Sequence, residues 1–456
     1  MKKAFLWGFF SLLSFQIFAQ NPWKELFNGT DFKGWTKKNG NAEYKIANKV
    51  IMGISQMNTP NTFLCTDEIY GDFVLEMEVK VDPGLNSGIQ IRSLSDPSFN
   101  NGRVHGYQVE IDPGGRSWAG GIYDEARNGW LYPLSVNPKG QTAFKNGQWN
   151  KYHIEAIGNN LKTWINGIPC ANVFDPQTAK GFIALQVHQI KNEAQNGLTV
   201  QWKNIRIATD NLKEVILKGG EEAPEISYLI NQLTENEKRK GWRLLWDGKT
   251  TDGWRLANYD TFPKQGWAIQ DGVLKVLGTK KDSTAKSGDI ITDKEFSNFE
   301  LEMDFKLTPG ANSGLKYFVV EDRKKRAGTG LGPEFQLLDD KVHPDAKEGV
   351  NGNRTTASLY DLITSENLSE GSKDKRMNPP GKWNKLRLVV KDGHVEHWLN
   401  NLKMVEYDRN SQIFRNLILK SKYNSYPNFG QAVSGHLLLQ DHGDEVHFRS
   451  IKIREF

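Results

Sequence analysis

One ordered set of short motifs occurs twice in this chain. The first set is Leu26–Gly29, Gly34–Trp35, Asn86–Gly88, Trp149–Asn150 and Gln186–His188. The second set, in the same order, is Leu245–Gly248, Gly253–Trp254, Asn312–Gly314, Trp383–Asn384 and Gln440–His442. A repeat of roughly 200 residues is far longer than a solenoid or propeller unit, so it predicts two complete domains of one fold.

Residues 1–19 have the pattern of an export signal. Lys2 and Lys3 precede an apolar run that ends before Ala19, a small residue at a plausible cleavage site. The run is too short for a convincing membrane span, so we expect no membrane insertion after cleavage and a periplasmic or secreted protein. Removing the two lysines lowers the formal net charge from +5 to +3, and no Lys/Arg-rich stripe is present. Nucleic acid is therefore not an expected partner.

Both copies have the pattern of β-structure. Residues 73–81 and 299–307 alternate apolar and charged residues, and a Pro-Gly turn follows each. Many short strands with little helix predict an all-β fold, two tandem jelly-roll β-sandwiches at 23–208 and 242–456. Apolar residues at helical spacing from Ile226 onward predict a short helical connector within 209–241.

The two cysteines, Cys65 and Cys170, both lie in the first copy. An exported compartment would permit a disulfide between them. The second copy lacks both residues, so the fold cannot require the bridge.

Polar residues gather on one face of several predicted strands. Gln108, Glu110 and Asp112 alternate with apolar residues, so they share a face at a spacing of roughly 7 Å. Carboxylates this close raise one another's pKa and suit acid/base work or cation binding, although a solvated outer face is the alternative. In the second copy Glu334 and Gln336 share a face, with Asp339 further on.

Neighbouring strands add polar groups to the same side. The same alternation selects Arg92 and Gln186 with His188 in the first copy, and Lys316 and Gln440 with His442 in the second, where Asp441 precedes the histidine. Aromatic residues suit sugar rings, and the pairs Tyr123-Asp124 and Tyr360-Asp361 occupy matching positions. Together these residues predict a polar groove that binds a carbohydrate.

The chain resembles a tandem of 3-keto-disaccharide hydrolase domains. The resemblance rests on the repeated Asx-Gly and Gly-Trp openings, on Asn-Ser-Gly after each Pro-Gly turn, and on Gly106–Asp112, Gly121–Glu125 and Leu439–Gly443. It covers nearly all of residues 23–456 and implies a concanavalin-A-like lectin/glucanase fold.

The resemblance also implies cleavage of glycosides that carry a ketone at C3. Such a ketone acidifies the C2 proton, so a base can remove it, the C1 substituent leaves by β-elimination, and water adds to the enone. For the second domain we expect Glu334 or His442 as the base, with Lys316 or a bound divalent cation at the enolate. For the first domain we expect Glu110 or His188 as the base and Arg92 as the electrostatic partner. No redox cofactor is needed.

Two other functions are compatible with the sequence. One is a non-catalytic glycan-binding protein on the same fold. The other is an ordinary glycosidase, but each copy has an amide where a pair of carboxylates would be needed, at Gln108 and at Gln336.

Overall fold

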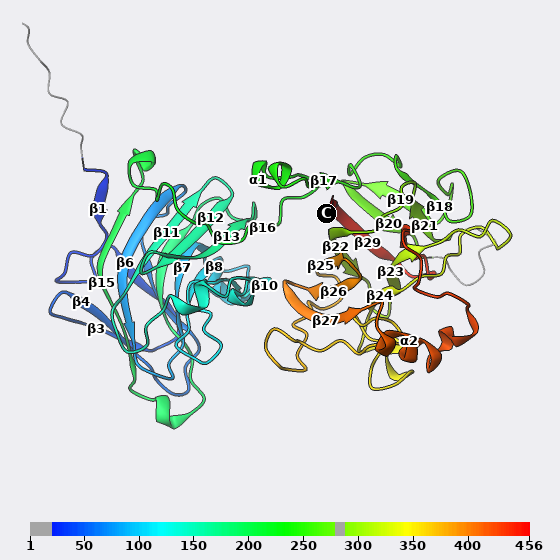
Figure 1. The fold of residues 1–456 in the computed structure, drawn as a ribbon. Coiled ribbons are helices and arrows are strands. Elements are labelled where there is room, and N and C mark those ends of the chain that lie inside the picture. The colour runs from blue at the N-terminus through cyan, green and yellow to red at the C-terminus, as the bar shows by residue number, and fades with distance from the viewer. Residues whose placement is uncertain (1–20, 279–287) are drawn as a thin grey trace, which may run out of the picture.

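The computed structural model describes residues 21–278 and 288–456, and most of its elements are β-strands. Four sheets form two β-sandwiches that lie side by side (Figure 1). The predicted all-β fold with two tandem sandwiches is confirmed. The predicted export signal at 1–19 lies outside the described residues. Within the described ranges, no helix has the length and apolar character needed to cross a membrane.

The first sandwich packs a nine-stranded sheet on a seven-stranded sheet. The larger sheet has the order β16-β13-β12-β11-β6-β15-β4-β3, with β1 beside β15. Its strands are β1 (Trp23–Glu25), β3 (Glu43–Ala47), β4 (Val50–Ile54), β6 (Phe73–Val81), β11 (Asn150–Ile157), β12 (Asn160–Ile165), β13 (Ile168–Phe174), β15 (Thr199–Ala208) and β16 (Ile226–Ser227). The smaller sheet has the order β10-β9-β8-β7-β14-β5-β2. Its strands are β2 (Trp35–Asn39), β5 (Thr62–Thr66), β7 (Ser87–Leu94), β8 (His105–Ile111), β9 (Ile122–Glu125), β10 (Gly129–Tyr132) and β14 (Phe182–Val187).

The second sandwich packs an eight-stranded sheet on a five-stranded sheet. The larger sheet has the order β19-β20-β29-β22-β25-β26-β27, with β17 beside β29. Its strands are β17 (Arg243–Leu244), β19 (Trp267–Gln270), β20 (Val273–Val276), β22 (Phe299–Leu307), β25 (Asn384–Lys391), β26 (His394–Leu399), β27 (Leu402–Asp408) and β29 (Val446–Glu455). The smaller sheet, in the order β18-β21-β28-β23-β24, comprises β18 (Trp254–Leu256), β21 (Ile290–Thr292), β23 (Asn312–Val319), β24 (Glu334–Leu338) and β28 (His436–Leu439). The α-helices are α1 (Glu235–Arg239) and α2 (Gln412–Leu419).

The cores form where the sheets of each sandwich face one another. In the central strand β6, the alternate residues Leu75, Met77 and Val79 are at most 1% exposed, and β22 places Leu301, Met303 and Phe305 in the same way. Burial of a side chain of this size stabilises the fold by about 1.5–3 kcal/mol. The alternation that marks these strands in the sequence therefore also fixes which face of each sheet is free for function.

The connector differs from the helical prediction. Ile226 and Ser227 form the short strand β16, which pairs in parallel with β13, and the helix α1 begins later, after Thr234. The edge strand β13 offers unpaired backbone groups, and pairing with them outweighs the helical spacing of the apolar residues. The Tyr228 hydroxyl donates to the Leu131 carbonyl of the first sandwich at 2.8 Å and accepts from the Asn401 amide of the second at 2.7 Å. The connector is thus bonded to both sandwiches.

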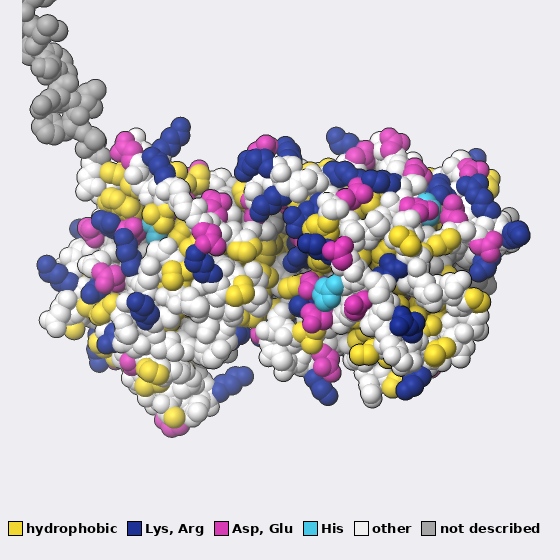
Figure 2. Space-filling view, in the orientation of Figure 1, with side chains coloured by type: hydrophobic (Ala, Val, Ile, Leu, Met, Phe, Trp, Pro, Cys, Tyr) yellow, Lys and Arg dark blue, Asp and Glu magenta, His cyan; other side chains and the backbone are white. Residues whose placement is uncertain are grey.

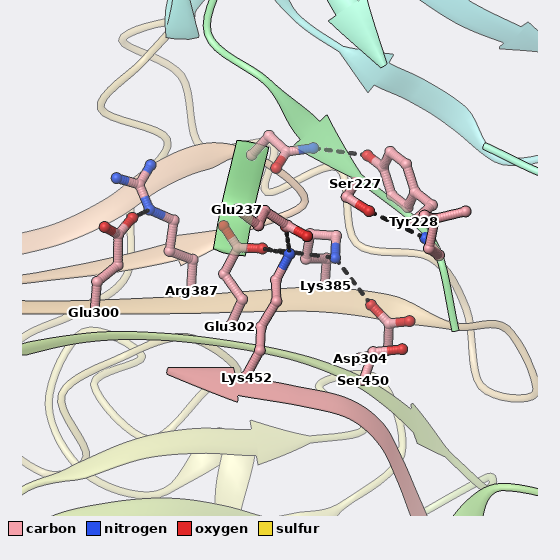
Figure 3. A network of polar contacts seen from close by, with 12 residues as sticks. Ser227, Tyr228, Glu237, Glu300, Glu302, Asp304, Lys385, Arg387, Ser450 and Lys452 are labelled. Carbon is pink, nitrogen blue, oxygen red and sulfur yellow. Dashed lines mark hydrogen bonds and ion pairs between the residues drawn. The ribbon is translucent and has the colours of Figure 1, made fainter. Parts of the chain in front are cut away.

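A buried polar network fastens the connector to the second sandwich (Figure 3). The Lys452 ammonium, 5% exposed, pairs with Glu237 of α1 and lies 2.9 Å from Glu302 on β22. Beside it Lys385 pairs with Asp304 at 3.2 Å. In the space-filling view, lysine and arginine side chains gather where the sandwiches meet (Figure 2).

Cys65 and Cys170 are free and buried, one on β5 and the other on β13. Burial raises the pKa of each thiol to about 12. The disulfide that the compartment would permit is not formed.

Candidate active site

A pocket of about 310 Å³ opens on the five-stranded sheet of the second sandwich. Its lining combines charged, amide and aromatic side chains, and consists of Asn312, Lys316, Leu331, Gly332, Glu334, Gln336, Tyr360, Lys422, Tyr423, Ser425, Tyr426, Gln440 and His442. The structure therefore brings together six residues that the sequence singled out, namely Lys316, Glu334, Gln336, Tyr360, Gln440 and His442.

Glu334 is the one carboxylate among the described residues that line the pocket. It lies on β24 opposite Lys316 of β23, and its carboxylate extends over Gly314, where a Cβ would come within 2.0 Å of Oε1. Glu334 is 5% exposed, and its side chain has no hydrogen-bond partner within the described ranges. Burial raises its pKa, against the opposing effect of the Lys316 and Lys422 ammonium groups. The result is a basic, unpartnered carboxylate that faces a cavity.

Lys316 is held in place by a second acid. Its ammonium lies 3.5 Å from Asp289 Oδ2 and donates to the Gly330 carbonyl at 3.2 Å. Burial opposes its charge, but Glu334 and Asp289 outweigh that effect and raise its pKa. Lys316 therefore provides a fixed positive charge beside Glu334. Asp289 was not identified from the sequence, because its match in the first copy is the apolar Phe63.

One wall of the pocket comes from a segment that the first sandwich lacks. In the second sandwich 27 residues separate β27 from β28, at 409–435, whereas seven, 175–181, separate β13 from β14. The long segment carries α2 and places Lys422, Tyr423 and Tyr426 against the pocket. The difference in length between the copies was the signal that could have identified these residues.

The remaining predicted residues of the second copy lie at or near the pocket rim. His442 is exposed, and its ring centroid is 6.4 Å from that of His343. Asp441 Oδ1 accepts from the Gly443 amide at 2.9 Å, while its buried Oδ2 has no partner. Asp339 accepts from the backbone amides of Gly310 and Lys341 and so shapes a turn.

Two side-chain amides that line the pocket can form further hydrogen bonds. Gln336 donates to Asn312 Oδ1 at 3.3 Å, and its Oε1 is buried without a partner. Gln440 lines the pocket beside it, with its backbone amide bonded to the Gly314 carbonyl. Buried polar atoms without partners are costly, so an unpaired oxygen next to a cavity indicates a place for a polar ligand.

On the equivalent face of the first sandwich the polar side chains bond one another, although Gln186 Oε1 is buried without a partner among the described residues. Gln108 replaces Glu334, and its Oε1 accepts from Gln90 at 2.5 Å and from Gln186 at 2.9 Å. Its amide donates to Glu110 Oε2 at 3.0 Å, and Asn86 donates to the other oxygen at 2.6 Å. We call these five residues the amide ladder. Its groups bond one another, and none of the five is more than partly exposed.

Glu110 is therefore a poor match for Glu334. It occupies the position of Gln336, opposite a glycine, and not the position of Glu334. Burial raises its pKa to about 7, although Asn86 and Gln108 favour the ionised form. A carboxylate with both oxygens bonded is less able to accept a proton from a ligand.

Two predicted residues of the first copy point away from this face. Arg92 has a φ of +44°, at a register shift between Ile91 and Leu94. Its guanidinium turns inward, donates to the Gly158 and Ala156 carbonyls of the opposite sheet and pairs with Asp72 at 2.9 Å. The prediction for Arg92 as partner of Glu110 is wrong, because the bulge reverses the face of its side chain.

Asp124 is also structural. It is fully buried opposite Tyr107, pairs with Arg127 at 2.6 Å, and accepts from the Asn128 side chain at 2.7 Å. Tyr123, next to it, points to the other face, opposite Gln108.

The last two predicted residues of the first copy lie at the edge of the polar face that carries the amide ladder. Asp112 pairs with Arg116 at 3.0 Å, and Arg116 in turn lies 4.0 Å from Glu370 of the second sandwich. His188 Nδ1 donates to the Gln189 carbonyl at 2.6 Å, and burial lowers the pKa of this histidine.

One group of three potential metal ligands occurs within the described residues. It consists of His394, Glu396 and Glu406, on β26 and β27, away from the pocket-lining set. Lys403 already donates to both carboxylates. This group is an ion-pair cluster on the sheet.

Comparisons with known proteins agree with the repeat. Residues 22–208 and 241–454 both match the model of one family, described as the 3-keto-alpha-glucoside-1,2-lyase-like domain. The chain belongs to this family. Both sandwiches are thus 3-keto-alpha-glucoside-1,2-lyase-like domains, and the family resemblance predicted from the sequence is confirmed.

Individual relatives match about half of the chain. A 3-keto-disaccharide hydrolase of Bacteroides thetaiotaomicron is 35% identical over 234 residues, which are 47% of this chain and 78% of the relative. The crystal structure of a proposed glycosyl hydrolase from Parabacteroides distasonis is 36% identical and covers 50% of this chain and 100% of its own, with a TM-score of 0.44. A second such structure from the same organism is 25% identical, covers 47% and 99%, and has a TM-score of 0.35. The family and the Bacteroides thetaiotaomicron hydrolase support a glycoside-hydrolase-like function.

Proposed function

We propose that the pocket of the second domain cleaves 3-keto-glycosides by elimination and hydration, with Glu334 as the base. The observation that carries this proposal is the state of Glu334. It is a buried carboxylate without a hydrogen-bond partner among the described residues, and it faces a cavity between two lysines. The family and its named hydrolase relative support the choice of substrate.

Elimination from a 3-keto-glycoside requires a base, which Glu334 provides, and a group that stabilises the enolate. The ketone at C3 makes the C2 proton acidic, so a carboxylate with a raised pKa can remove it. Negative charge then develops on the C3 oxygen, and the Lys316 ammonium, fixed by Asp289, stabilises the enolate. The C1–O bond breaks, and water adds to C1 of the enone while Glu334 returns the proton to C2. The sum of the steps is hydrolysis.

The lining of the pocket favours this route over ordinary glycosidase chemistry. A retaining or inverting glycosidase uses two carboxylates on either side of the bond that is cut. Among the described residues that line the pocket Glu334 is the one carboxylate, and Gln336 occupies the neighbouring position on β24. Tyr360, Tyr423 and Tyr426 provide aromatic surface for a sugar ring.

The first domain lacks each of these features. Gln108 takes the place of the base and Gln90 that of Lys316, and the amide ladder leaves no open carboxylate. We therefore propose that catalysis belongs to the second domain alone. An export signal at residues 1–19 would place the reaction in the periplasm or outside the cell.

The test compares a 3-keto-glucoside with its unoxidised parent glycoside. The full chain should release the aglycone from the keto form only, and Glu334→Gln should abolish release. Glu110→Gln is the matched control in the first domain and should keep the activity of the unmodified chain. Binding of both glycosides without cleavage of either would instead support a glycan-binding protein.

A further inference from the structure

The two lysines beside Glu334 differ in how they are held. Lys316 is engaged by Asp289 and by the Gly330 carbonyl. Lys422 lines the same pocket, but its ammonium has no hydrogen-bond or ion-pair partner within the described residues. It lies 4.1 Å from the centroid of the Tyr360 ring, so the aromatic face holds it while its N–H groups remain available.

The backbone around Lys422 is fixed. The Lys422 amide donates to Asp361 Oδ2 at 2.9 Å, and Ser421 caps the short turn that follows. The next residue, Tyr423, stacks on Phe429 with ring centroids 3.9 Å apart. These contacts place the lysine side chain toward the pocket and limit its freedom.

The two lysines are held by segments on opposite sides of β24. Lys316 lies on β23, whereas Lys422 lies against Tyr360, whose backbone amide donates to the Glu334 carbonyl from the other side of β24. A sugar whose C2 proton faces Glu334 would have one lysine on each flank. Lys316 would then lie near the C3 oxygen, and Lys422 would lie near the substituent on C1.

Elimination needs a proton at the departing oxygen, because an alkoxide is a poor leaving group. Burial lowers the pKa of Lys422, with Glu334 acting in the opposite direction, so its ammonium is a stronger acid than an exposed lysine. The two neighbouring tyrosines fit less well. The Tyr360 hydroxyl donates to Asp345 at 2.8 Å, and burial raises the pKa of Tyr423.

We propose that Lys422 is the general acid that protonates the aglycone oxygen, an assignment that rests on the proposed function of this pocket. Glu334 takes the C2 proton, the electron pair of that C–H bond forms the C1=C2 double bond, and the pair of the C1–O bond leaves with the aglycone. The aglycone oxygen takes a proton from the Lys422 ammonium. The resulting amine then removes a proton from the water that adds to C1, and Glu334 returns its proton to C2.

The experiment varies the leaving group. A 4-nitrophenyl 3-keto-glucoside departs with little need for an acid, whereas the methyl 3-keto-glucoside needs one. Lys422→Met in the full chain should lower kcat/KM for the methyl substrate by about 10²–10⁴-fold, the usual contribution of acid catalysis, and change the nitrophenyl rate only a few-fold. Lys422→Arg keeps the charge but is too weak an acid, so it should behave like Lys422→Met.

Two results would overturn the assignment. Equal losses on both substrates would show that Lys422 binds the sugar or shapes the wall. Full methyl activity in Lys422→Arg would show that charge alone is needed. Failure of the unmodified chain to cleave either keto-glucoside, or full activity of Glu334→Gln, would instead refute the proposed function itself.

Discussion

Gly314 offers a sharp test of the proposed base because the carboxylate of Glu334 lies directly over it. A Cβ at position 314 would come within 2.0 Å of Glu334 Oε1 and 2.8 Å of Cδ. To regain ordinary contact at about 3.5 Å, that oxygen must retreat by roughly 1.5 Å. The carboxyl group is the flexible end of its side chain, so Gly314→Ala should displace the base and leave the fold intact.

The expected effect is on catalysis. A displacement of about 1 Å costs on the order of 100-fold in rate, so kcat on a 3-keto-glucoside should fall by about that factor. Gly88→Ala is the matched control, since its Cβ would meet Gln108 Cδ at 2.3 Å on the equivalent face of the first domain. That variant should keep full turnover. Gly314→Ala with unchanged turnover, or equal losses in both variants, would refute the reasoning.

Three further predictions concern stability. The Lys452→Met change removes a buried charge from between two acids, so it should lower the free energy of unfolding in urea by about 3–5 kcal/mol. The Lys403→Met change on the surface should lower it by at most about 1 kcal/mol. Similar losses in the two variants would contradict this prediction. The pKa of Glu110 is raised from 4.5 to about 7, so its contribution to the free energy of unfolding should be fully present below pH 4.5 and be lost as pH rises through 7. Glu110→Gln should remove that fall, on the order of 3 kcal/mol; a pH dependence unchanged by the mutation would contradict the assignment. The Tyr228→Phe change leaves the Leu131 carbonyl and the Asn401 amide without this partner, so it should lower the free energy of unfolding by about 1–3 kcal/mol and speed proteolysis of the connector. Unchanged stability and an unchanged rate of proteolysis would show that the contact is dispensable.

The sequence predicted those parts of the site that depend on strand alternation. The face of Glu334, Gln336 and Lys316 follows from a period of two along regular strands, and the structure places all three in one pocket. The same rule failed at Arg92. This residue has a left-handed backbone conformation, which turns its side chain to the other face of the sheet, and no local sequence pattern predicts that conformation.

Other parts depend on tertiary structure. Lys422 and Tyr426 come from a segment without alternation, and only its folding against the sheet brings them to Glu334. The connector strand at Ile226 forms because the edge of β13 is available. The predicted connector does contain a helix, α1, but its first apolar residues join the sheet, which a local spacing cannot reveal.

The proposed reaction begins with removal of the proton at C2. The most direct measurement compares the turnover of a 3-keto-glucoside that carries hydrogen at C2 with one that carries deuterium there, using the methyl glycoside at saturating and limiting concentrations. We expect slower release of methanol from the deuterated substrate and no release from the unoxidised parent glycoside. Equal rates for the two isotopic forms, together with cleavage of the unoxidised parent, would contradict this mechanism.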